Sequence, residues 1–316
     1  MAGSIPLQPG SAGNAPRASR GMSSRLYDLV ETWLSKIVLA PSVCACFVFV
    51  YGFIIWTAVL SLTPSRMLPV YEFIGFEQYS NLWDNDRWWL ALKNLVIFGG
   101  CFIVVCLVVG LLLAILLDQR VRAEGFIRQI YLYPMALSFI VTGTAWKWIL
   151  NPGLGFEKLM HDLGFANFTF DWLVNPDRAI YTIVIAGVWQ SSGFVMALFL
   201  AGLRGIDDSI IKAARVDGAS LPRIYWRIIL PSLRPVFFSS FMILAHIAIK
   251  SFDLVVSLTG GGPGFASDVP ATFMYIHAFT RNQIGLGAAS AMMMLMVIIA
   301  VVVPMIWSET RRTRNG

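Results

Sequence analysis

The sequence predicts an all-α integral membrane protein with six transmembrane helices and both termini on the cytoplasmic side. Two observations point to this class. Hydrophobic residues make up 57% of the 316 residues and charged residues only 13%, a balance that a water-soluble domain of this length does not need. The apolar residues also gather in long runs that are separated by shorter polar segments. Bilayer insertion explains both features.

Six stretches reach the roughly 20 apolar residues that a helix needs to cross the hydrocarbon core. They are 37–62, 89–117, 126–150, 179–203, 235–258 and 283–307. The first 24 residues are rich in Gly, Ser, Ala, Pro and Arg and contain no apolar run. We therefore expect 1–24 to be a disordered cytoplasmic tail and 25–316 to form the transmembrane domain.

The distribution of charge sets the expected orientation. An even number of spans puts both termini on one side, and basic residues collect on the cytoplasmic side. Lys and Arg outnumber Asp and Glu in the tail, around the 118–125 loop, in the 204–234 loop and at the C-terminal end, whereas the opposite loops show the reverse. We expect a multi-pass protein of the inner (plasma) membrane, with the lipid bilayer and not nucleic acid as the partner of its net positive charge.

The 204–234 loop is too long to be a simple connection and has the composition of a folded segment. Asp207, Asp208 and Ser209 are N-cap candidates for a short helix over 210–215, and Gly218 then predicts a turn with positive φ. A second helix is expected from Ser220 to Leu230, with isoleucines on one face and arginines on another. Prolines at 231 and 235 are expected to separate it from the fifth span.

The motif inside this loop resembles that of a known family. Ala213-Ala214 stands three residues before Asp217-Gly218-Ala219, and Leu230-Pro231 follows. This spacing resembles the signature loop of permease subunits in bacterial binding-protein-dependent ABC importers. A pair of helices that merely anchors the chain to anionic lipid is the plainer alternative.

Over about residues 37–310 the chain is similar to the carbohydrate-uptake branch, which includes maltose and glycerol-phosphate permeases. The stretches Ala145–Pro152 with Gly155, Trp189–Phe194 and Thr259–Pro263 agree with that branch. A glucose or mannose permease is the nearest resemblance within it.

The resemblance implies the type I ABC importer architecture and a chain that is not itself an enzyme. It implies three kinds of partner: a second permease, expected to be a different chain, two copies of an ATPase subunit, and a periplasmic sugar-binding protein. ATP and Mg would be bound by the ATPase, because the sequence has no G-x-x-x-x-G-K-[ST] phosphate loop. We expect this chain to bind no cofactor and no metal.

The resemblance also assigns a role to the loop, which in the family docks on the ATPase. The residues that match this motif, and to which the resemblance gives the role of coupling to the ATPase, are Lys212, Ala213, Ala214, Asp217, Gly218, Ala219, Leu230 and Pro231. Small residues are expected to form the close-packed part of the contact. Lys212 stands where the family usually has a glutamate. We interpret this change of charge as an altered contact with the ATPase and not as a loss of function.

Placing polar side chains within a membrane span costs free energy, and such side chains usually face the bundle interior, so they are candidates for the transport path. The candidates are Trp189, Gln190, Ser191 and Phe194 in the fourth span and His246, Lys250 and Asp253 in the fifth. Aromatic rings stack on a sugar ring and amides bind its hydroxyls. The spacing of four and three predicts one shared helical face for the last three. Plain helix-helix contacts, a packed histidine, and a Lys250–Asp253 pair that neutralises itself remain alternatives.

Two other function classes predict different sequence features. A secondary transporter driven by an ion gradient would use Lys250 and Asp253 as a relay, but it predicts repeated broken helices and more carboxylates within the spans. A membrane enzyme would need a cluster of catalytic or metal-binding groups, and the three histidines are scattered while the four cysteines lie in apolar runs, where packing explains them. The Thr259–Pro263 turn is expected to be flexible and to lie at the outer mouth, where the binding protein sits.

Overall fold

The computed structural model describes residues 33–34, 36, 38–119 and 122–315, with side chains described as far as Trp307. Every regular element of the described chain is helical, which confirms the all-α class. The chain forms two compact units, Met1–Trp56 and Thr57–Gly316. The first unit contains the π-helical segment Phe47–Gly52 and the start of α2 (Phe53–Leu60). The predicted tail 1–24 lies outside the described residues.

Four helical stretches of the described chain are long and apolar enough to cross a membrane. They are Val38–Leu60, α4 (Asp86–Asp118), α8 (Ala179–Arg204) and Ile284–Trp307 of α15 (Ile284–Asn315). A fifth arises if the bent pair Leu221–Ser232 and Arg234–Ile249 counts as one span. Five of the six predicted stretches therefore have a counterpart, and the total of six remains a prediction.

The third predicted stretch, 126–150, is not one helix. It is divided into α5 (Glu124–Leu132), a 3₁₀ turn (Tyr133–Ala136) and α6 (Phe139–Ile149). Pro134 explains the division, because proline has no N–H to donate and its ring clashes with the preceding turn of an α-helix. Ser138 then starts the new helix as an N-cap, with its side chain accepting a hydrogen bond from the Val141 N–H at 3.3 Å. The prediction of a continuous span here is wrong.

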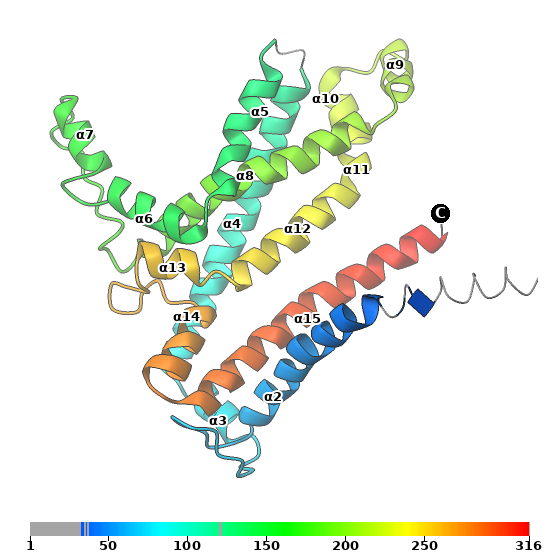
Figure 1. The fold of residues 1–316 in the computed structure, drawn as a ribbon. Coiled ribbons are helices and arrows are strands. Elements are labelled where there is room, and N and C mark those ends of the chain that lie inside the picture. The colour runs from blue at the N-terminus through cyan, green and yellow to red at the C-terminus, as the bar shows by residue number, and fades with distance from the viewer. Residues whose placement is uncertain (1–32, 35, 37, 120–121, 316) are drawn as a thin grey trace, which may run out of the picture. The chain divides into compact units, whose positions relative to one another are not determined.

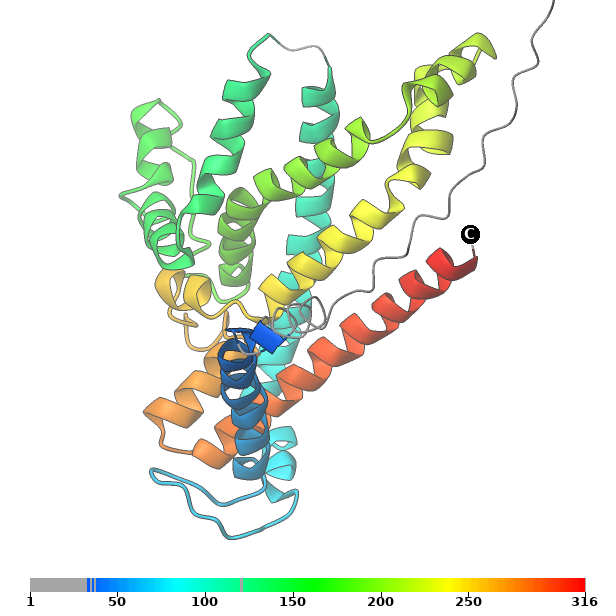
Figure 2. The same ribbon diagram turned by 45° about the vertical axis from the view of Figure 1, so that its right-hand side comes forward.

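The core of the second unit forms where α4 packs along α8 (Figures 1 and 2). Phe98 and Phe102 stack within it at 5.4 Å, and Cys106 is buried, as its apolar run predicts. Gly110 allows a close approach, because a Cβ there would lie 2.6 Å from Cγ1 of Val195. The helix α12 (Arg234–Ile249) packs on both α4 and α8.

Shorter helices complete the described chain. They are α3 (Glu77–Trp83), α7 (Phe156–Asp162), α9 (Asp208–Val216), α10 (Leu221–Ile224), α11 (Leu230–Ser232), α13 (Asp253–Leu258) and α14 (Pro270–Tyr275), with π-helical turns at Tyr225–Ile229 and Ile276–Thr280. Both ribbon views place α9 and α10 at the end of α4 that is far from α3 and α14 (Figures 1 and 2). The two groups of short elements therefore mark opposite ends of the long helices.

Candidate functional site

The 204–234 loop is folded, and α9 is held at both of its ends. Asp207 is its N-cap, with Oδ1 accepting the N–H of Ser209 at 2.8 Å. This bond from the backbone amide, reinforced by the Ser209 side chain, lowers the pKa of the Asp207 carboxyl. At the other end Gly218 has φ +76°, as predicted, and the N–H of Ala219 bonds the carbonyl of Ala214 at 3.0 Å.

The coupling residues divide by what they contact. Lys212, Ala213, Asp217 and Gly218 are exposed. Ala214 and Ala219 are half-buried against the hydrophobic core of their own chain. Ala214 therefore fixes α9 in place, and the exposed residues are the ones free for another subunit.

The second helix of the loop differs from its prediction at its end. Ile224 and Ile229 are buried while Arg223 and Arg227 are exposed, so the expected two-faced pattern is confirmed. The helix does not stop before Pro231. It continues through the half-buried Leu230 and Pro231 to Ser232 and meets α12 at a bend of 61°. This bend lies between Pro231 and Pro235 and separates the loop from the fifth span as predicted, and only the end of the helix lies two residues further along than expected.

The fifth span is broken at the residues proposed for the path. The helix α12 ends at Ile249, and α13 begins only at Asp253. The predicted single helical face for His246, Lys250 and Asp253 is therefore wrong. All three nevertheless line one hollow of about 210 Å³, together with Phe139, Ile247, Ser251 and Leu254. We call this hollow the broken-helix pocket.

His246, Lys250 and Asp253 are all exposed in the isolated chain. No ion pair joins Lys250 to Asp253 within 4 Å among the described residues. Mutual neutralisation therefore does not account for them in this conformation. The pocket presents an imidazole, an ammonium and a carboxylate beside the ring of Phe139.

The helix that follows the break in the fifth span packs on the helix that follows the break in the third. Gly143 of α6 is in direct contact with Oγ of Ser257 in α13, and no side chain fits between them. The same hydroxyl lies 2.7 Å from the carbonyl oxygen of Asp253 and 3.2 Å from that of Leu254. Non-helical backbone at membrane depth is tolerated where it lines a cavity, and Lys250 and Ser251 of the fifth-span break line the broken-helix pocket.

The fourth span packs against the break in the third stretch. Gln190 donates from Nε2 to the carbonyl of Leu137 at 2.7 Å, at the end of the turn that divides the third stretch. Gly193 lies against the carbonyl of Tyr131 so closely that a Cβ would collide with it. Gln190 is thus a structural contact in this conformation, with its Oε1 buried and unpartnered among the described residues.

The other candidates of the fourth span have different environments. Ser191 is buried and Phe194 half-buried. Trp189 is 41% exposed and meets Trp146 edge to face at 5.9 Å. None of the four lines the broken-helix pocket, so the structure groups the two sets of predicted path residues separately.

A buried ion pair that the sequence did not reveal anchors the opposite end of the unit. Arg87 donates from Nε to Oδ2 of Asp268 at 2.6 Å, and the side chains are 9% and 0% exposed. Thr272 bonds the other carboxylate oxygen, and Phe265 lies 3.8 Å from the guanidinium. Asn94 donates to the carbonyl of Asp268 at 2.9 Å.

The glycine-rich turn beside this pair is pinned, which corrects the expectation of a flexible turn at Thr259–Pro263. The hydroxyl oxygen of Ser267 lies 2.8 Å from Oγ1 of Thr259 and 2.7 Å from the carbonyl oxygen of Gly262, so that it bridges the two ends of the turn. The sequence of this Gly/Ser-rich loop did not indicate that the Ser267 hydroxyl would hold its two ends together by hydrogen bonds.

Several helices long and apolar enough to cross a membrane, with a folded loop at one end of the long helices and a hydrogen-bonded segment at the other, define the class as an integral membrane protein. The chain belongs to the family described as the binding-protein-dependent transport system inner membrane component, whose family model matches residues 107–310. The matched region includes the loop and both helix breaks.

Known proteins agree with this assignment. The chain is 37% identical to a probable ABC transporter permease protein of Pyrococcus horikoshii over 86% of this chain and 94% of that one. It is 36% identical to the xylose/arabinose import permease protein XacH of Haloferax volcanii over 83% and 84%. Its fold matches a chain of a bacterial alginate ABC transporter, solved in complex with an alginate pentasaccharide-bound periplasmic protein, with a TM-score of 0.79, 20% identity and coverage of 92% and 99%. The ABC importer permease fold expected from the sequence is confirmed.

Proposed function

We propose that this chain is the sugar-conducting permease subunit of an ATP-driven importer fed by a solute-binding protein. The observation that carries the proposal is the 204–234 loop. Its helix α9 is fixed from within by Asp207, Ala214 and Gly218, while Lys212 and Ala213 remain exposed. A rigid element with an unused face suits docking on another subunit.

The assembly that we propose has a second, different permease chain and two copies of an ATPase that binds ATP and Mg. This chain would cross the inner membrane six times with both termini in the cytoplasm. The loop with α9 and α10 would then face the cytoplasm, and the end of α4 at Asp86 would face outward. The basic character of the loop supports this orientation.

We propose a monosaccharide such as glucose or mannose as the substrate. The name of the Haloferax volcanii relative, a xylose/arabinose import permease, supports a sugar. The broken-helix pocket supports a polar path, because His246, Lys250 and Asp253 offer charged hydrogen-bonding groups beside an aromatic ring. Trp189, with Trp146 at its edge, is the aromatic surface on which a sugar ring would stack.

The coupling role is tested by placing a bulky charge on the exposed face of α9. The chain is co-purified with the other subunits in nanodiscs, and ATPase activity is measured with and without sugar-loaded binding protein. We expect Ala213→Arg to lose the ATPase subunit or its stimulation, because the arginine occupies the docking face. The matched control is Ala166→Arg, at an exposed alanine outside the loop, which keeps both. Transport that follows an ion gradient without any associated ATPase would refute the importer.

The path is tested by uptake into vesicles of labelled glucose, mannose, xylose and maltose in competition. We expect Asp253→Asn and Lys250→Gln to lower sugar uptake while the ATPase subunit stays bound, since neither residue lies near the loop. Uptake unchanged by both variants would remove the broken-helix pocket from the path.

A further inference from the structure

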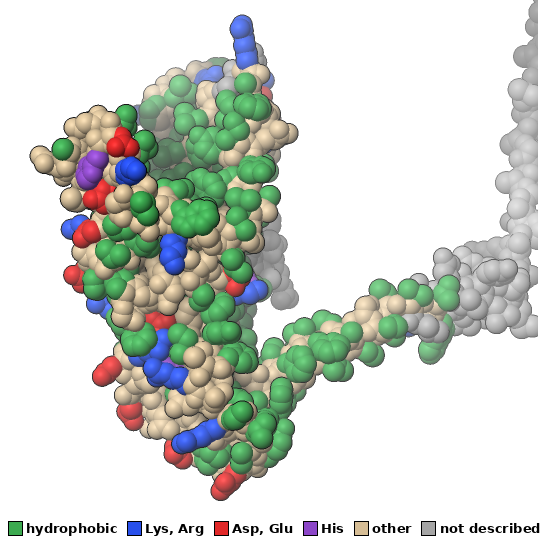
Figure 3. Space-filling model, turned by 60° about the vertical axis from the view of Figure 1, so that its left-hand side comes forward, with side chains coloured by type: hydrophobic (Ala, Val, Ile, Leu, Met, Phe, Trp, Pro, Cys, Tyr) green, Lys and Arg blue, Asp and Glu red, His purple; other side chains and the backbone are tan. Residues whose placement is uncertain are grey.

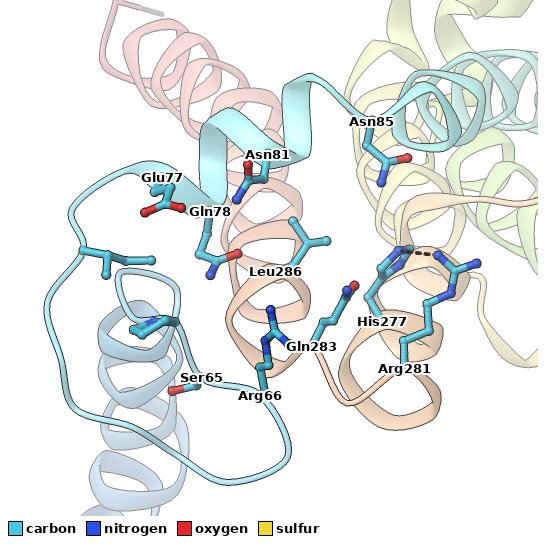
Figure 4. Close-up of a pocket in the computed structure, with 12 residues that line it drawn as sticks. Ser65, Arg66, Glu77, Gln78, Asn81, Asn85, His277, Arg281, Gln283 and Leu286 are labelled. Atoms are coloured by element: carbon cyan, nitrogen blue, oxygen red, sulfur yellow. Dashed lines mark hydrogen bonds between the residues drawn. The ribbon is translucent and has the colours of Figure 1, made fainter.

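A second polar hollow lies at the outer end of the same unit, far from the broken-helix pocket and the loop. It has a volume of about 390 Å³ and is lined from two segments, 64–85 and 277–286. Figure 4 shows Arg66, Gln78 and Gln283 turned toward the same space, with the bonded pair His277 and Arg281 at its other side. We call it the outer pocket.

The outer pocket contains two guanidinium groups that have no acidic partner. No carboxylate lies within 4 Å of Arg66 or Arg281 among the described residues. Arg281 instead donates to Nε2 of His277 at 3.2 Å, while Nδ1 of that ring faces the carbonyl of Phe273 at 3.0 Å. Since a carbonyl only accepts, Nδ1 carries the proton and the imidazole is neutral. Burial lowers the pKa of His277, and the charge of Arg281 lowers it further, which agrees with this tautomer.

The remaining lining strengthens the preference for an anion. The amides of Gln78, Asn81 and Gln283 supply further N–H donors, and Glu77 is the one carboxylate in the lining. The pocket also meets the N-terminal ends of the 33-residue helix α4, through Asn85, and of α15, through Gln283 and Leu286. Helix N-termini add positive potential to the guanidinium charges.

Within the first lining segment, the loop 67–76 presents exposed apolar side chains. Met67, Leu68, Tyr71, Phe73 and Phe76 are each at least 70% exposed. The loop is nevertheless fixed, because the N–H of Val70 bonds Oγ of Ser65 at 3.0 Å and the N–H of Ile74 bonds the carbonyl of Leu62 at 3.0 Å. Fixed, exposed aromatic side chains around a polar hollow are typical of a protein docking surface.

We propose that the outer pocket receives an acidic side chain of the solute-binding protein when that protein docks. This inference rests on the proposed function and adds the place and chemistry of one contact. A carboxylate pairs with both guanidinium groups, and the apolar loop 67–76 covers the surface around it. Guanidinium groups favour carboxylates because their N–H donors match both oxygens.

The charges at the rim favour a protein over an anionic lipid headgroup. Glu72, Asp84 and Asp86 are exposed and lie close to the pocket residues in sequence. In the view of Figure 3, acidic and basic side chains are mixed with apolar ones over the lower part of the molecule. A uniformly anionic bilayer surface would be repelled by those carboxylates. A protein can present an acid to the arginines and basic groups to the rim.

The test measures how ATPase activity of the reconstituted transporter rises with the concentration of its sugar-loaded binding protein. We expect Arg66→Gln/Arg281→Gln to raise the half-saturating concentration about tenfold or more and to weaken its dependence on salt, since an ion pair is lost. Arg66→Gln alone, at an exposed position, gives a smaller shift in the same direction. The matched control is Arg178→Gln, another exposed arginine outside the pocket, which leaves the curve unchanged.

Three results would overturn the proposal. If the wild type is stimulated and the double variant has the same half-saturating concentration, the pocket is not a docking site while the importer stands. If the variants instead lose a response of the wild type to anionic lipid in the nanodisc, the pocket binds a headgroup. If the wild type itself shows no stimulation by binding protein, the proposed function fails together with the docking site. Retention of the ATPase subunit by each variant shows that it has folded.

Discussion

Breaking the Arg87–Asp268 pair tests how the end of the unit that holds α3 and α14 is stabilised. Removing one partner of a buried pair leaves the other charge unpaired and costs about 3–5 kcal/mol. With side chains 9% and 0% exposed, this pair is screened little by water, so Arg87→Ala is expected within that range. The lost contact with the Phe265 ring at 3.8 Å acts in the same direction.

The double variant Arg87→Ala/Asp268→Ala separates the interaction energy of the pair from the individual effects of the two substitutions. It leaves no unpaired charge, so its cost should fall short of the sum of the single variants by about 2–3 kcal/mol. The free energy of unfolding is measured by titrating a denaturant into the purified chain in mixed micelles. The control is Arg178→Ala, which removes a half-exposed pair with Asp171 and should cost at most about 1 kcal/mol. A coupling below about 0.5 kcal/mol would refute the reasoning.

Three further predictions concern the helix breaks and the outer pocket. Gly193→Ala places a Cβ against the Tyr131 carbonyl and should destabilise the chain by about 1–3 kcal/mol or more, seen as a loss of monodisperse protein. Gln190→Leu removes the hydrogen bond to the Leu137 carbonyl and should lower the free energy of unfolding by only about 1 kcal/mol, because the loss of the unpartnered buried Oε1 offsets part of the cost. The pKa of His277 is lowered in the fold, so the unfolded chain binds more protons in acid; thermal stability should be full above about pH 6.5 and fall as the pH drops below it.

Controls for these variants come from the same chain. Gly100→Ala places a Cβ in open space and should leave the protein monodisperse. Gln190→Glu replaces the donor by an acceptor facing a carbonyl and should be worse than leucine. His277→Gln should flatten the acid limb of the stability profile, and an unchanged limb would assign it to another group.

The sequence predicted the loop well because its signals are local. An N-cap at Asp207 and a glycine at positive φ act within one turn of helix, and both are found as expected. The helix that follows was predicted to end at Leu230 and runs two residues further, to Ser232, before the 61° bend that separates it from α12.

The breaks in the third and fifth stretches were harder to predict. Hydropathy measures only apolar length, and a broken span has the same length as a continuous one. Pro134 was the visible signal for the third stretch. The fifth has no proline near Lys250, and its break is stabilised by the packing of α13 on α6, which is a contact between residues more than a hundred positions apart.

The contacts at the end of the unit that holds α3 and α14 were missed for a related reason. Trp88 lies near the end of a predicted span, yet it is 1% exposed and packs edge to face on Phe273 at 5.2 Å. Arg87 and Asp268 are 181 positions apart, and each looks like an ordinary loop charge until the fold brings them together.

The geometry of α12 connects the loop to the proposed path. Its first residue follows the 61° bend at the end of the loop, and its last precedes Lys250 in the broken-helix pocket. Sixteen residues of α-helix are about 24 Å long, so a tilt of about 10° at the bend displaces the far end by about 4 Å. A shift of that size is comparable to a hydrogen-bond length and is enough to remake the contacts of His246 and Lys250. Because α12 has no proline between its first turn and its end, it transmits the tilt as one rigid element, whereas the break after Ile249 allows α13 to stay packed on α6. In the proposed path, such a tilt would move the side of the pocket formed by α12 while the side formed by α6 and α13 stays in place.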